Sequence, residues 1–211
     1  SEINELVVSF YMLVNRYISE IFNSNMYCIR DENSREGILI DPGMGDEERL
    51  LGYLRKTDIN PKYVILTHEH FDHCAGVNIL ERFYDFYLLA TKECAEKIKS
   101  DKGNLSRYVM EVINPFEIVH PVWVIEDLQR LILNGVELKF IKTPGHASGG
   151  MCILVENYLF SGDTLLETKV PVKLPGSNKI CLQNSLARLR EFCDFSWRVY
   201  PGHGDSFSFS L

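Results

Sequence analysis

The chain has 211 residues, which favours one larger domain over two, and its 45% apolar and 24% charged residues are ordinary for a globular protein. The net charge of −7 argues against a broad nucleic-acid-binding surface, because binding to a phosphate backbone depends on Lys and Arg. We therefore expect a single domain over residues 1–211 and no nucleic-acid partner.

The first apolar run, LVVSFYMLV at 6–14, is only nine residues long. A membrane-spanning helix needs about 20 apolar residues. Glu2 and Glu5 precede the run, so the basic start of a signal peptide is missing. The run is interpreted as a core strand, which predicts a cytoplasmic protein with no membrane partner.

Six cysteines occur at positions 28, 74, 94, 152, 181 and 193, and no two of them form a C-x-x-C pair. A chain of this length does not need disulfides to stabilise its fold. We predict that the cysteines are mostly reduced, buried thiols.

The first half of the chain alternates between strand and helix patterns. Strands are predicted at 25–30, 37–43, 61–67 and 87–91, and helices at 45–57, 75–84 and 92–100. The helix at 45–57 has acidic residues in its first turn and basic residues in its last, as the helix dipole favours.

The second half begins with a hairpin pattern, LILNGVELKF at 131–140, in which Asn134 and Gly135 suit a type I′ turn. A second hairpin is predicted over 151–163 across Asn157, and a helix over 182–192 has three leucines on one face. Strands that alternate with helices and are interrupted by tight hairpins predict mixed sheets covered by helices.

The stretch THEHFDHCAG (67–76) lies between a predicted strand that ends at Thr67 and a predicted helix that begins near Ala75. Four side chains that can bind a metal occupy the connection: His68, His70, Asp72 and His73. Histidine and carboxylate ligands suit zinc, iron or manganese. The alternative is a polar surface loop that is merely rich in histidine.

Three later segments repeat the arrangement of a strand followed by a ligand type. They are TPGHASGG (143–150) with His146, LFSGDTLL (159–166) with Asp163, and VYPGHGD (199–205) with His203. Glycine lies beside each of these residues and lets the backbone turn sharply near a bound ion. Five of the six histidines thus lie in strand-end loops, which favours a metal site over a solvated loop.

Together with IDPG (40–43), these motifs resemble the metallo-β-lactamase superfamily, and within it the glyoxalase II-like hydrolases. They occur in the family's order over nearly the whole chain. The resemblance implies an α/β fold, a four-layer αβ/βα sandwich with two mixed β-sheets, and a two-metal site at one edge of the sheets.

The resemblance also implies a ligand set. It assigns His68, His70 and His146 to one metal ion, Asp72, His73 and His203 to the other, and Asp163 to a bridge between them. Asp41 would steady the ligand loop from behind, while Glu69 and Phe71 would be spacers. Two divalent ions are expected, with zinc favoured and iron or manganese as alternatives, and Asp72 and Asp163 are the expected catalytic residues.

The implied activity is hydrolysis of a small thioester, ester or lactone by a metal-bound hydroxide. Metal binding lowers the pKa of water to about 7, so that no protein nucleophile is required. Cys74 beside His73 is interpreted as a small packing residue rather than a nucleophile.

The substrate is left open. Glyoxalase II adds a helical region after the last ligand, whereas this chain ends eight residues after His203. In VPVKLPGS (170–177), Pro171 and Lys173 replace an arginine and an aspartate that are frequent in glyoxalase II-like proteins. Both departures argue against a glutathione thioester.

Two alternatives of other classes are kept. The first is an iron-dependent persulfide dioxygenase, in which His68, His146 and Asp163 would hold one iron. The second is a metal-binding protein without turnover. Antibiotic hydrolysis is disfavoured, because the best-known zinc β-lactamases carry cysteine at the position of Asp163, and a homodimer is left open.

Two segments have more than one interpretation. Residues 104–127 form either an edge helix or a lid that brings Phe116 and Trp123 to the substrate. The loop at 167–179 carries Lys169, Lys173 and Lys179 against one acidic residue, Glu167. It is either a solvated loop or a means of attracting an anionic substrate.

Overall fold

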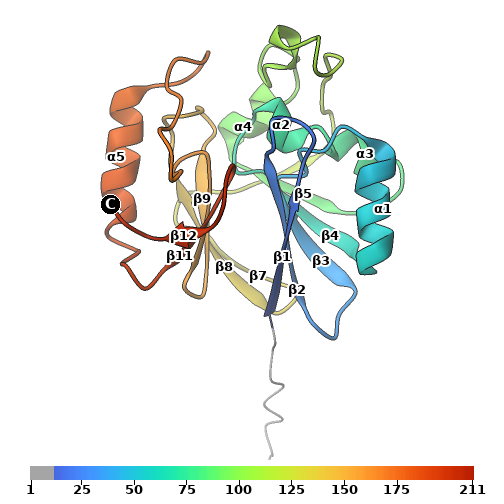
Figure 1. Cartoon of the computed structure of the whole chain (residues 1–211), viewed down its shortest axis with the longest axis horizontal. Helices are drawn as coiled ribbons and strands as arrows, with labels where there is room; N and C mark the ends of the chain where they lie inside the picture. Colours follow the sequence, from blue (N-terminus) through green and yellow to red (C-terminus); the bar gives the residue numbers. More distant parts are fainter. Residues whose placement is uncertain (1–11) are drawn as a thin grey trace, which may run out of the picture.

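The computed structural model describes residues 12–211, and within them two six-stranded sheets pack face to face (Figure 1). The first sheet has the order β1 (Met12–Ile18), β2 (Asn25–Asp31), β3 (Glu36–Ile40), β4 (Asn60–Ile65), β5 (Tyr87–Ala90) and β6 (Val122–Val124). The second has the order β12 (Phe207–Ser208), β11 (Arg198–Pro201), β10 (Tyr158–Gly162), β9 (Met151–Val155), β8 (Val136–Lys142) and β7 (Arg130–Leu133).

Both sheets are mixed. In the first, β3 to β6 pair in parallel while β1 and β2 are antiparallel. In the second, β10 and β11 are parallel and the other pairs are antiparallel.

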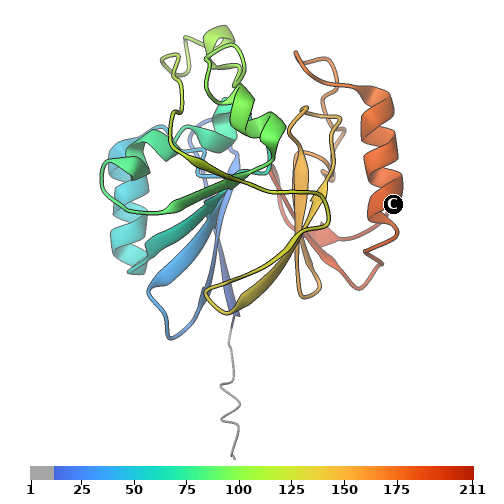
Figure 2. The ribbon, with the colours of Figure 1, turned by 180° about the vertical axis from the view of Figure 1, so that it is seen from behind.

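Helices cover the outer faces of the sheets (Figures 1 and 2). Four pack on the first sheet: α1 (Glu47–Thr57), α2 (Phe71–Cys74), α3 (Val77–Glu81) and α4 (Lys92–Lys97). Helix α5 (Lys179–Leu189) packs on the second. The order helix, sheet, sheet, helix is the predicted four-layer sandwich.

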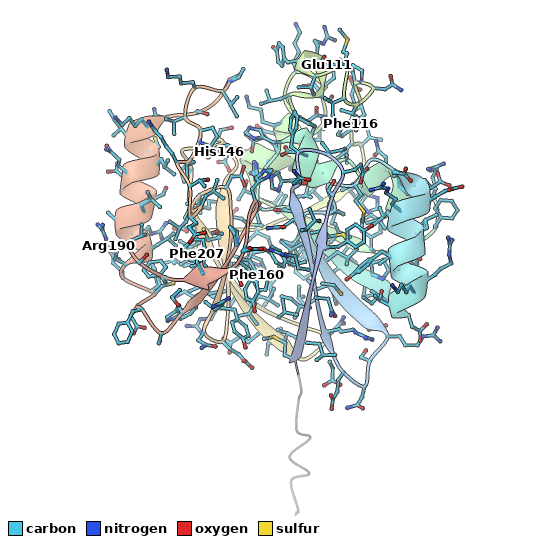
Figure 3. The ribbon with its side chains drawn as sticks, in the orientation of Figure 1. Glu111, Phe116, His146, Phe160, Arg190 and Phe207 are labelled. Carbon is cyan, nitrogen blue, oxygen red and sulfur yellow. The ribbon has the colours of Figure 1, made fainter. Side chains whose placement is uncertain are left out.

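The core follows from the alternation of side chains along each strand. In β2, Tyr27 and Ile29 point between the sheets, whereas Met26 and Cys28 face the helices α1 to α4. In the second sheet, Phe160 of β10 lies between the sheets (Figure 3). Strands buried on both faces hold the loops at their ends in fixed positions.

The loops that follow β4, β8, β10 and β11 meet at one edge of the sandwich. Within the second sheet, β8, β10 and β11 run in the same direction, so their carboxyl ends share an edge. The amide of Met151 donates to the carbonyl of Thr67 at 2.8 Å and joins this edge to the end of β4.

The predicted helix over 75–84 is corrected by the structure. The helical backbone begins at Phe71 and is broken at Gly76, so that Asp72 and His73 lie within α2 rather than in a loop. A hydrogen bond from the amide of Gly76 to the carbonyl of Pro42 causes the break. That bond draws the chain away from a continuous helix.

The predicted hairpin turn and the free, mostly buried cysteines are confirmed, whereas the predicted core strand at 6–14 is not. Asn134 and Gly135 both have positive φ, as a type I′ turn requires. The predicted strand at 6–14 lies largely outside the described residues, and its described end starts β1, a half-exposed edge strand rather than a core strand. The six cysteines lie within the described part and are free thiols, and all but Cys181 are buried.

Residues 104–127 do not form an edge helix. They contain a single 3-10 turn (Ser106–Tyr108) and the short strand β6. Phe116 packs beside a cluster that includes Phe71, whereas Trp123 lies in β6 with its ring against Tyr87. The two aromatic side chains therefore pack against different neighbours, and the role of this segment as a lid stays a prediction.

Among residues 12–211, no helix combines the length and the apolar character needed to cross a membrane.

Candidate metal centre

The structure brings the seven candidate side chains together at the shared edge of the sheets. Six of them form two groups in which the ligand atoms lie within 4.8 Å of one another: His68, His70 and His146 in the first group, and Asp72, His73 and His203 in the second. Their elements differ, because Asp72 and His73 come from α2 and the others from strand-end loops. In Figure 3 His146 lies in the upper half of the molecule, below Glu111.

Asp163, at the end of β10, lies between the two groups. Its Oδ2 atom is 3.3 Å from His146 Nε2 and 3.5 Å from His203 Nε2. Its Oδ1 atom is 3.6 Å from His73 Nε2. One carboxylate thus faces histidines of both groups, the geometry that a bridging ligand needs.

Fixed hydrogen-bond partners orient two of the rings through Asp41. The hydroxyl of Thr67 donates to Asp41 Oδ2 at 2.6 Å and is left to accept from His68 Nδ1 at 3.0 Å. His73 Nδ1 lies 3.1 Å from the same carboxylate oxygen. In both rings Nδ1 is then the protonated nitrogen, and Nε2 is free to bind a metal.

Backbone carbonyls orient two further rings in the same way. His203 Nδ1 donates to the carbonyl of Phe22 at 3.2 Å, and His146 Nδ1 donates to the carbonyl of Pro171 at 2.9 Å. The Nε2 atoms of His73 and His203 then face each other at 3.3 Å. Two lone pairs at that distance require a proton or a metal ion between them.

Two buried polar atoms without a hydrogen-bond partner support a metal ion as the group that would bind them. His68 Nε2 and Asp163 Oδ1 have no hydrogen-bond partner among the described residues. A buried polar atom without a partner costs about 1–3 kcal/mol, so such atoms are rare unless an ion or water binds them. A Cβ on Gly202 would lie 2.1 Å from Asp163 Oδ1, so glycine keeps this atom accessible. The donor set therefore suits a binuclear metal site.

Four of the histidines fall into two kinds by the direction in which their surroundings shift the pKa. Burial lowers the pKa of His68 far below its usual value, and the positive charge of His73 adds to this effect. Burial and the neighbouring His146 lower the pKa of His70 to about 3. These two rings are neutral at physiological pH, the form that binds metals.

The second group has the opposite balance. Burial opposes the protonation of His73 and His203, but the carboxylates of Asp72 and Asp163 outweigh it and raise their pKa values to about 9 and about 10. Burial also opposes ionisation of the two carboxyls, yet the adjacent histidines keep both pKa values below their usual range. The ionised carboxylates of Asp72 and Asp163 therefore attract positive charge to the second group.

Asp41 is a supporting residue in this geometry, although it also lies near His68 and His73 as a third possible group. Its Oδ1 accepts from the amide of Thr67 at 2.7 Å, and its Oδ2 has the two contacts described above. Its oxygens already have protein partners, which agrees with the supporting contact expected from the sequence.

Glu69 is the residue whose contacts the sequence did not indicate. The resemblance implies a spacer that binds no metal, and the structure adds that Glu69 is buried and accepts three hydrogen bonds from Ser148 and Gly149. Its partners follow 79 and 80 positions later in the chain. No local pattern could have identified them.

Cys74 has the environment of a packing residue. Its side chain is fully buried, and burial raises the pKa of the thiol well above its usual value. A thiol that stays protonated is a poor nucleophile.

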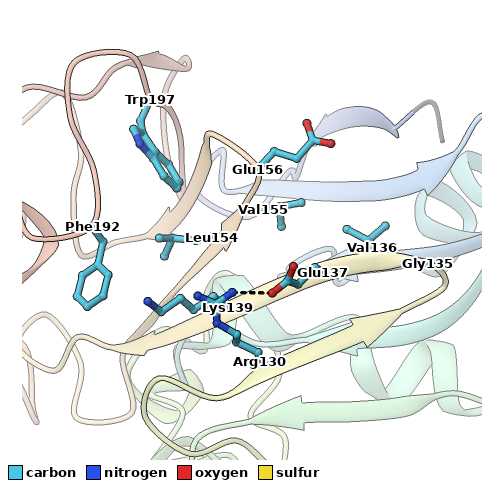
Figure 4. A pocket seen from close by; sticks show the side chains of 10 residues that line it. All are labelled: Arg130, Gly135, Val136, Glu137, Lys139, Leu154, Val155, Glu156, Phe192 and Trp197. Carbon is cyan, nitrogen blue, oxygen red and sulfur yellow. Dashed lines mark hydrogen bonds and ion pairs between the residues drawn. The ribbon is translucent and has the colours of Figure 1, made fainter. Parts of the chain in front are cut away.

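One surface cavity lies away from this cluster. It has a volume of about 420 Å³ on the outer face of the second sheet and is lined by Phe192 and Trp197 and by an ion pair between Arg130 and Glu137 (Figure 4). None of the seven candidate ligands lines it. The groups that can bind a metal therefore lie outside this cavity, at the sheet edge.

The fold and the cluster together define a metal-binding αβ/βα sandwich protein. The sequence pattern of the metallo-β-lactamase superfamily matches residues 20–203, which is most of the chain. The chain belongs to the metallo-β-lactamase superfamily.

Two curated relatives are similar over most of their length. A probable metallo-hydrolase of Methanocaldococcus jannaschii is 31% identical over 190 residues, covering 87% of this chain and 89% of the relative. The probable polyketide biosynthesis zinc-dependent hydrolase BaeB of Bacillus velezensis is 27% identical over 185 residues, covering 87% of this chain and 74% of the relative.

Solved structures agree on the fold. The crystal structure of TTHA1623 in a di-iron-bound form superposes with a TM-score of 0.79 at 27% identity, covering 92% of this chain and 94% of that one. The B3 metallo-β-lactamase BLEG-1 superposes with a TM-score of 0.84 at 22% identity, covering 93% and 94% of the two chains. The second match shows the fold alone.

Proposed function

We propose that this protein is a metal-dependent hydrolase that cleaves a small thioester, ester or lactone at a two-metal centre. His68, His70 and His146 hold one ion in this proposal, Asp72, His73 and His203 hold the other, and Asp163 bridges them. The position of the Asp163 carboxylate, 3.3 to 3.6 Å from histidines of both groups, carries the proposal.

The chain's own groups prepare the centre. Thr67, Asp41 and the carbonyls of Phe22 and Pro171 hold Nδ1 of four rings, so that Nε2 of each ring would be free to hold an ion. When bound, a pair of metal ions supplies water activation and polarisation of a carbonyl group. We assign Asp72 and Asp163 as the catalytic groups, because both carboxylates are ionised and would hold the ions that act on the substrate.

Zinc is the metal we propose. The mixed nitrogen and oxygen donors suit zinc as well as iron. The BaeB relative is named as zinc-dependent, while TTHA1623 was solved with two irons. Iron therefore remains the main alternative. A homodimer, a cytoplasmic location and the lack of nucleic-acid and membrane partners remain predictions.

The test combines metal analysis with one substitution. Purified protein is expected to contain up to two zinc ions per chain and to hydrolyse at least one member of a panel of small thioesters, esters and lactones. Asp163→Asn should lower kcat at least about 100-fold, as loss of a preorganised charged group does. Its circular dichroism spectrum should stay unchanged.

Two results would contradict the proposal. Near-normal turnover by Asp163→Asn would show that no bridging carboxylate is needed. One iron per chain, with oxygen consumption on a persulfide and no hydrolysis, would support the dioxygenase alternative instead. The fold similarity to the ETHE1 protein of Myxococcus xanthus, at 20% identity, does not favour either outcome.

A further inference from the structure

Glu69 is a buried carboxylate in the middle of the ligand run that takes no part in the proposed metal binding. It lies between His68 and His70 in the sequence, and its side chain reaches toward the loop that carries His146. Only 3% of its surface is exposed. A charge so deeply buried needs strong hydrogen bonds to offset its lost hydration.

Those hydrogen bonds come from one short segment. Glu69 Oε1 accepts from the amide and the hydroxyl of Ser148 at 3.1 and 2.8 Å, and Oε2 accepts from the amide of Gly149 at 3.0 Å. Both carboxylate oxygens are therefore used, and all three donors follow His146 by two or three residues. Hydrogen bonds to an ionised acceptor are about twice as strong as neutral ones.

The His146 loop depends on such contacts, because it has no regular secondary structure. On its other side it is held by the hydroxyl of Ser177, which donates to the carbonyl of His146 at 2.7 Å, and by the carbonyl of Pro171. Glu69 ties Ser148 and Gly149 of the loop to the ligand run. The hydroxyl of Thr91 donates to the carbonyl of Gly149, and the amide of Met151 donates to the carbonyl of Thr67, so the ends of the loop are held to the first sheet as well. Of these contacts, those of Glu69 lie nearest to His146 in the chain and therefore bear on its distance from His68 and His70.

We propose that Glu69 is a positioning residue that assembles the first ligand group by joining the His146 loop to the ligand run at 68–73. This inference rests on one part of the proposed function, namely that the two groups bind metal ions. Asp41 acts differently, because it supports His73 directly and His68 through Thr67, and so contacts both groups. Loss of Glu69 should therefore weaken one metal site, and loss of Asp41 should weaken both.

The experiment measures zinc affinity rather than turnover. The full-length wild type, Glu69→Gln, Ser148→Ala and Asp41→Asn are freed of metal and titrated with zinc against a chromophoric chelator. Glu96→Gln is the matched control, because Glu96 is an exposed glutamate on α4. In Glu69→Gln the amide group replaces one acceptor by a donor that faces a backbone N–H.

For Glu69→Gln we expect one zinc site to weaken by about 10–100-fold, the range found when groups that support a ligand are removed. The other site should keep its affinity, and Asp41→Asn should weaken both. Ser148→Ala removes only the hydroxyl bond and should weaken the same single site to a smaller extent. A purely structural role would lower stability without changing the ratio of the two zinc affinities.

Equal weakening of both sites by Glu69→Gln, or two unchanged sites, would overturn the inference. If Glu69→Gln fails to fold, Ser148→Ala decides, and an unchanged ratio of its affinities overturns the proposal. A wild type that binds no metal would refute the proposed function itself. A wild type with two sites that Glu69→Gln leaves unchanged would refute only the role of Glu69.

Discussion

For single residues, the orientation of four histidine rings in the centre depends on the hydrogen-bond partner of each Nδ1 atom. His73 and His68 are oriented by side chains, whereas His203 and His146 are oriented by backbone carbonyls. A carbonyl acceptor depends on the path of the chain rather than on the identity of its residue. The loops around Phe22 and Pro171 can therefore vary in sequence while still orienting the ligands.

The contact between Pro171 and His146 also bears on substrate charge. Lys173 is exposed two residues after Pro171, so the basic loop at 167–179 borders the proposed centre. We predict that Lys173→Ala raises KM several-fold for substrates that carry a carboxylate or phosphate and leaves KM for neutral esters nearly unchanged. A lysine is a flexible point charge, and salt screens its attraction over a Debye length of about 10 Å at 0.1 M.

Steady-state kinetics at low and high salt check this expectation. The variant should also show a weaker salt dependence of kcat/KM, and Lys56→Ala on α1 is the control at a remote exposed lysine. Equal losses on charged and neutral substrates would mean that Lys173 acts through loop order instead.

At the scale of elements, the break between α2 and α3 positions two of the candidate ligands. Helix α2 carries Asp72 and His73, and its direction is fixed where Gly76 meets the loop after β3. A Cβ at Gly76 would lie 2.6 Å from the carbonyl oxygen of Pro42, closer than real contacts allow. Close approach, rather than backbone conformation, explains glycine here, because its φ of −75° suits any residue.

Two Gly→Ala substitutions should therefore have opposite effects on stability. Gly52→Ala, in the interior of α1 with open space around it, should raise the free energy of unfolding by about 0.5–1 kcal/mol. Gly76→Ala should lower it by about 1–3 kcal/mol, as overpacking does. For a chain of this size, each 1 kcal/mol corresponds to a Tm shift of about 2–4 °C.

Thermal unfolding of both variants measures the difference. A Gly76→Ala protein as stable as Gly52→Ala would show that the Pro42 contact yields without cost, and that the helix break has another cause.

At the scale of the whole molecule, the sandwich concentrates opposite charges at one sheet edge, and its stability without metal should depend on pH in two directions. His73 and His203 have raised pKa values, so their contribution is complete below about pH 6.5 and is lost as pH rises through about 9 and 10. His68 and His70 have lowered pKa values, so their contribution exists above about pH 6.5 and is lost as the medium becomes acidic.

We predict that the Tm of chelator-treated protein is highest near neutral pH and falls toward both pH 5 and pH 10. Added zinc should flatten the alkaline fall, because a metal ion replaces the protons on His73 and His203. Thermal unfolding from pH 5 to 10, with and without zinc, provides the measurement. A metal-free protein that gains stability steadily up to pH 10 would contradict the charge balance described for the second group.

Most of the strands, most of the helices and the candidate side chains of the centre could be predicted from the sequence. The patterns behind these predictions are local. Strand β4 was predicted at 61–67 and is observed at Asn60–Ile65, because a short apolar run bounded by turn residues can be recognised without knowing its distant partners. The ligand types directly after four strands were equally local. The parallel ends of β8, β10 and β11 then had to bring three of these loops to one edge.

The groups that support those side chains are evident only from the packing of the folded chain. Helix α2 begins at Phe71 rather than near Ala75, within a chain path fixed by the loop of Pro42 and Gly43. The contacts of Glu69 could not be predicted, because a glutamate whose hydrogen-bond donors lie 79 and 80 positions away cannot be told by its sequence from one that faces water. Whether a charge is solvated or clamped depends on which distant amides the fold brings to it, and that is a property of packing.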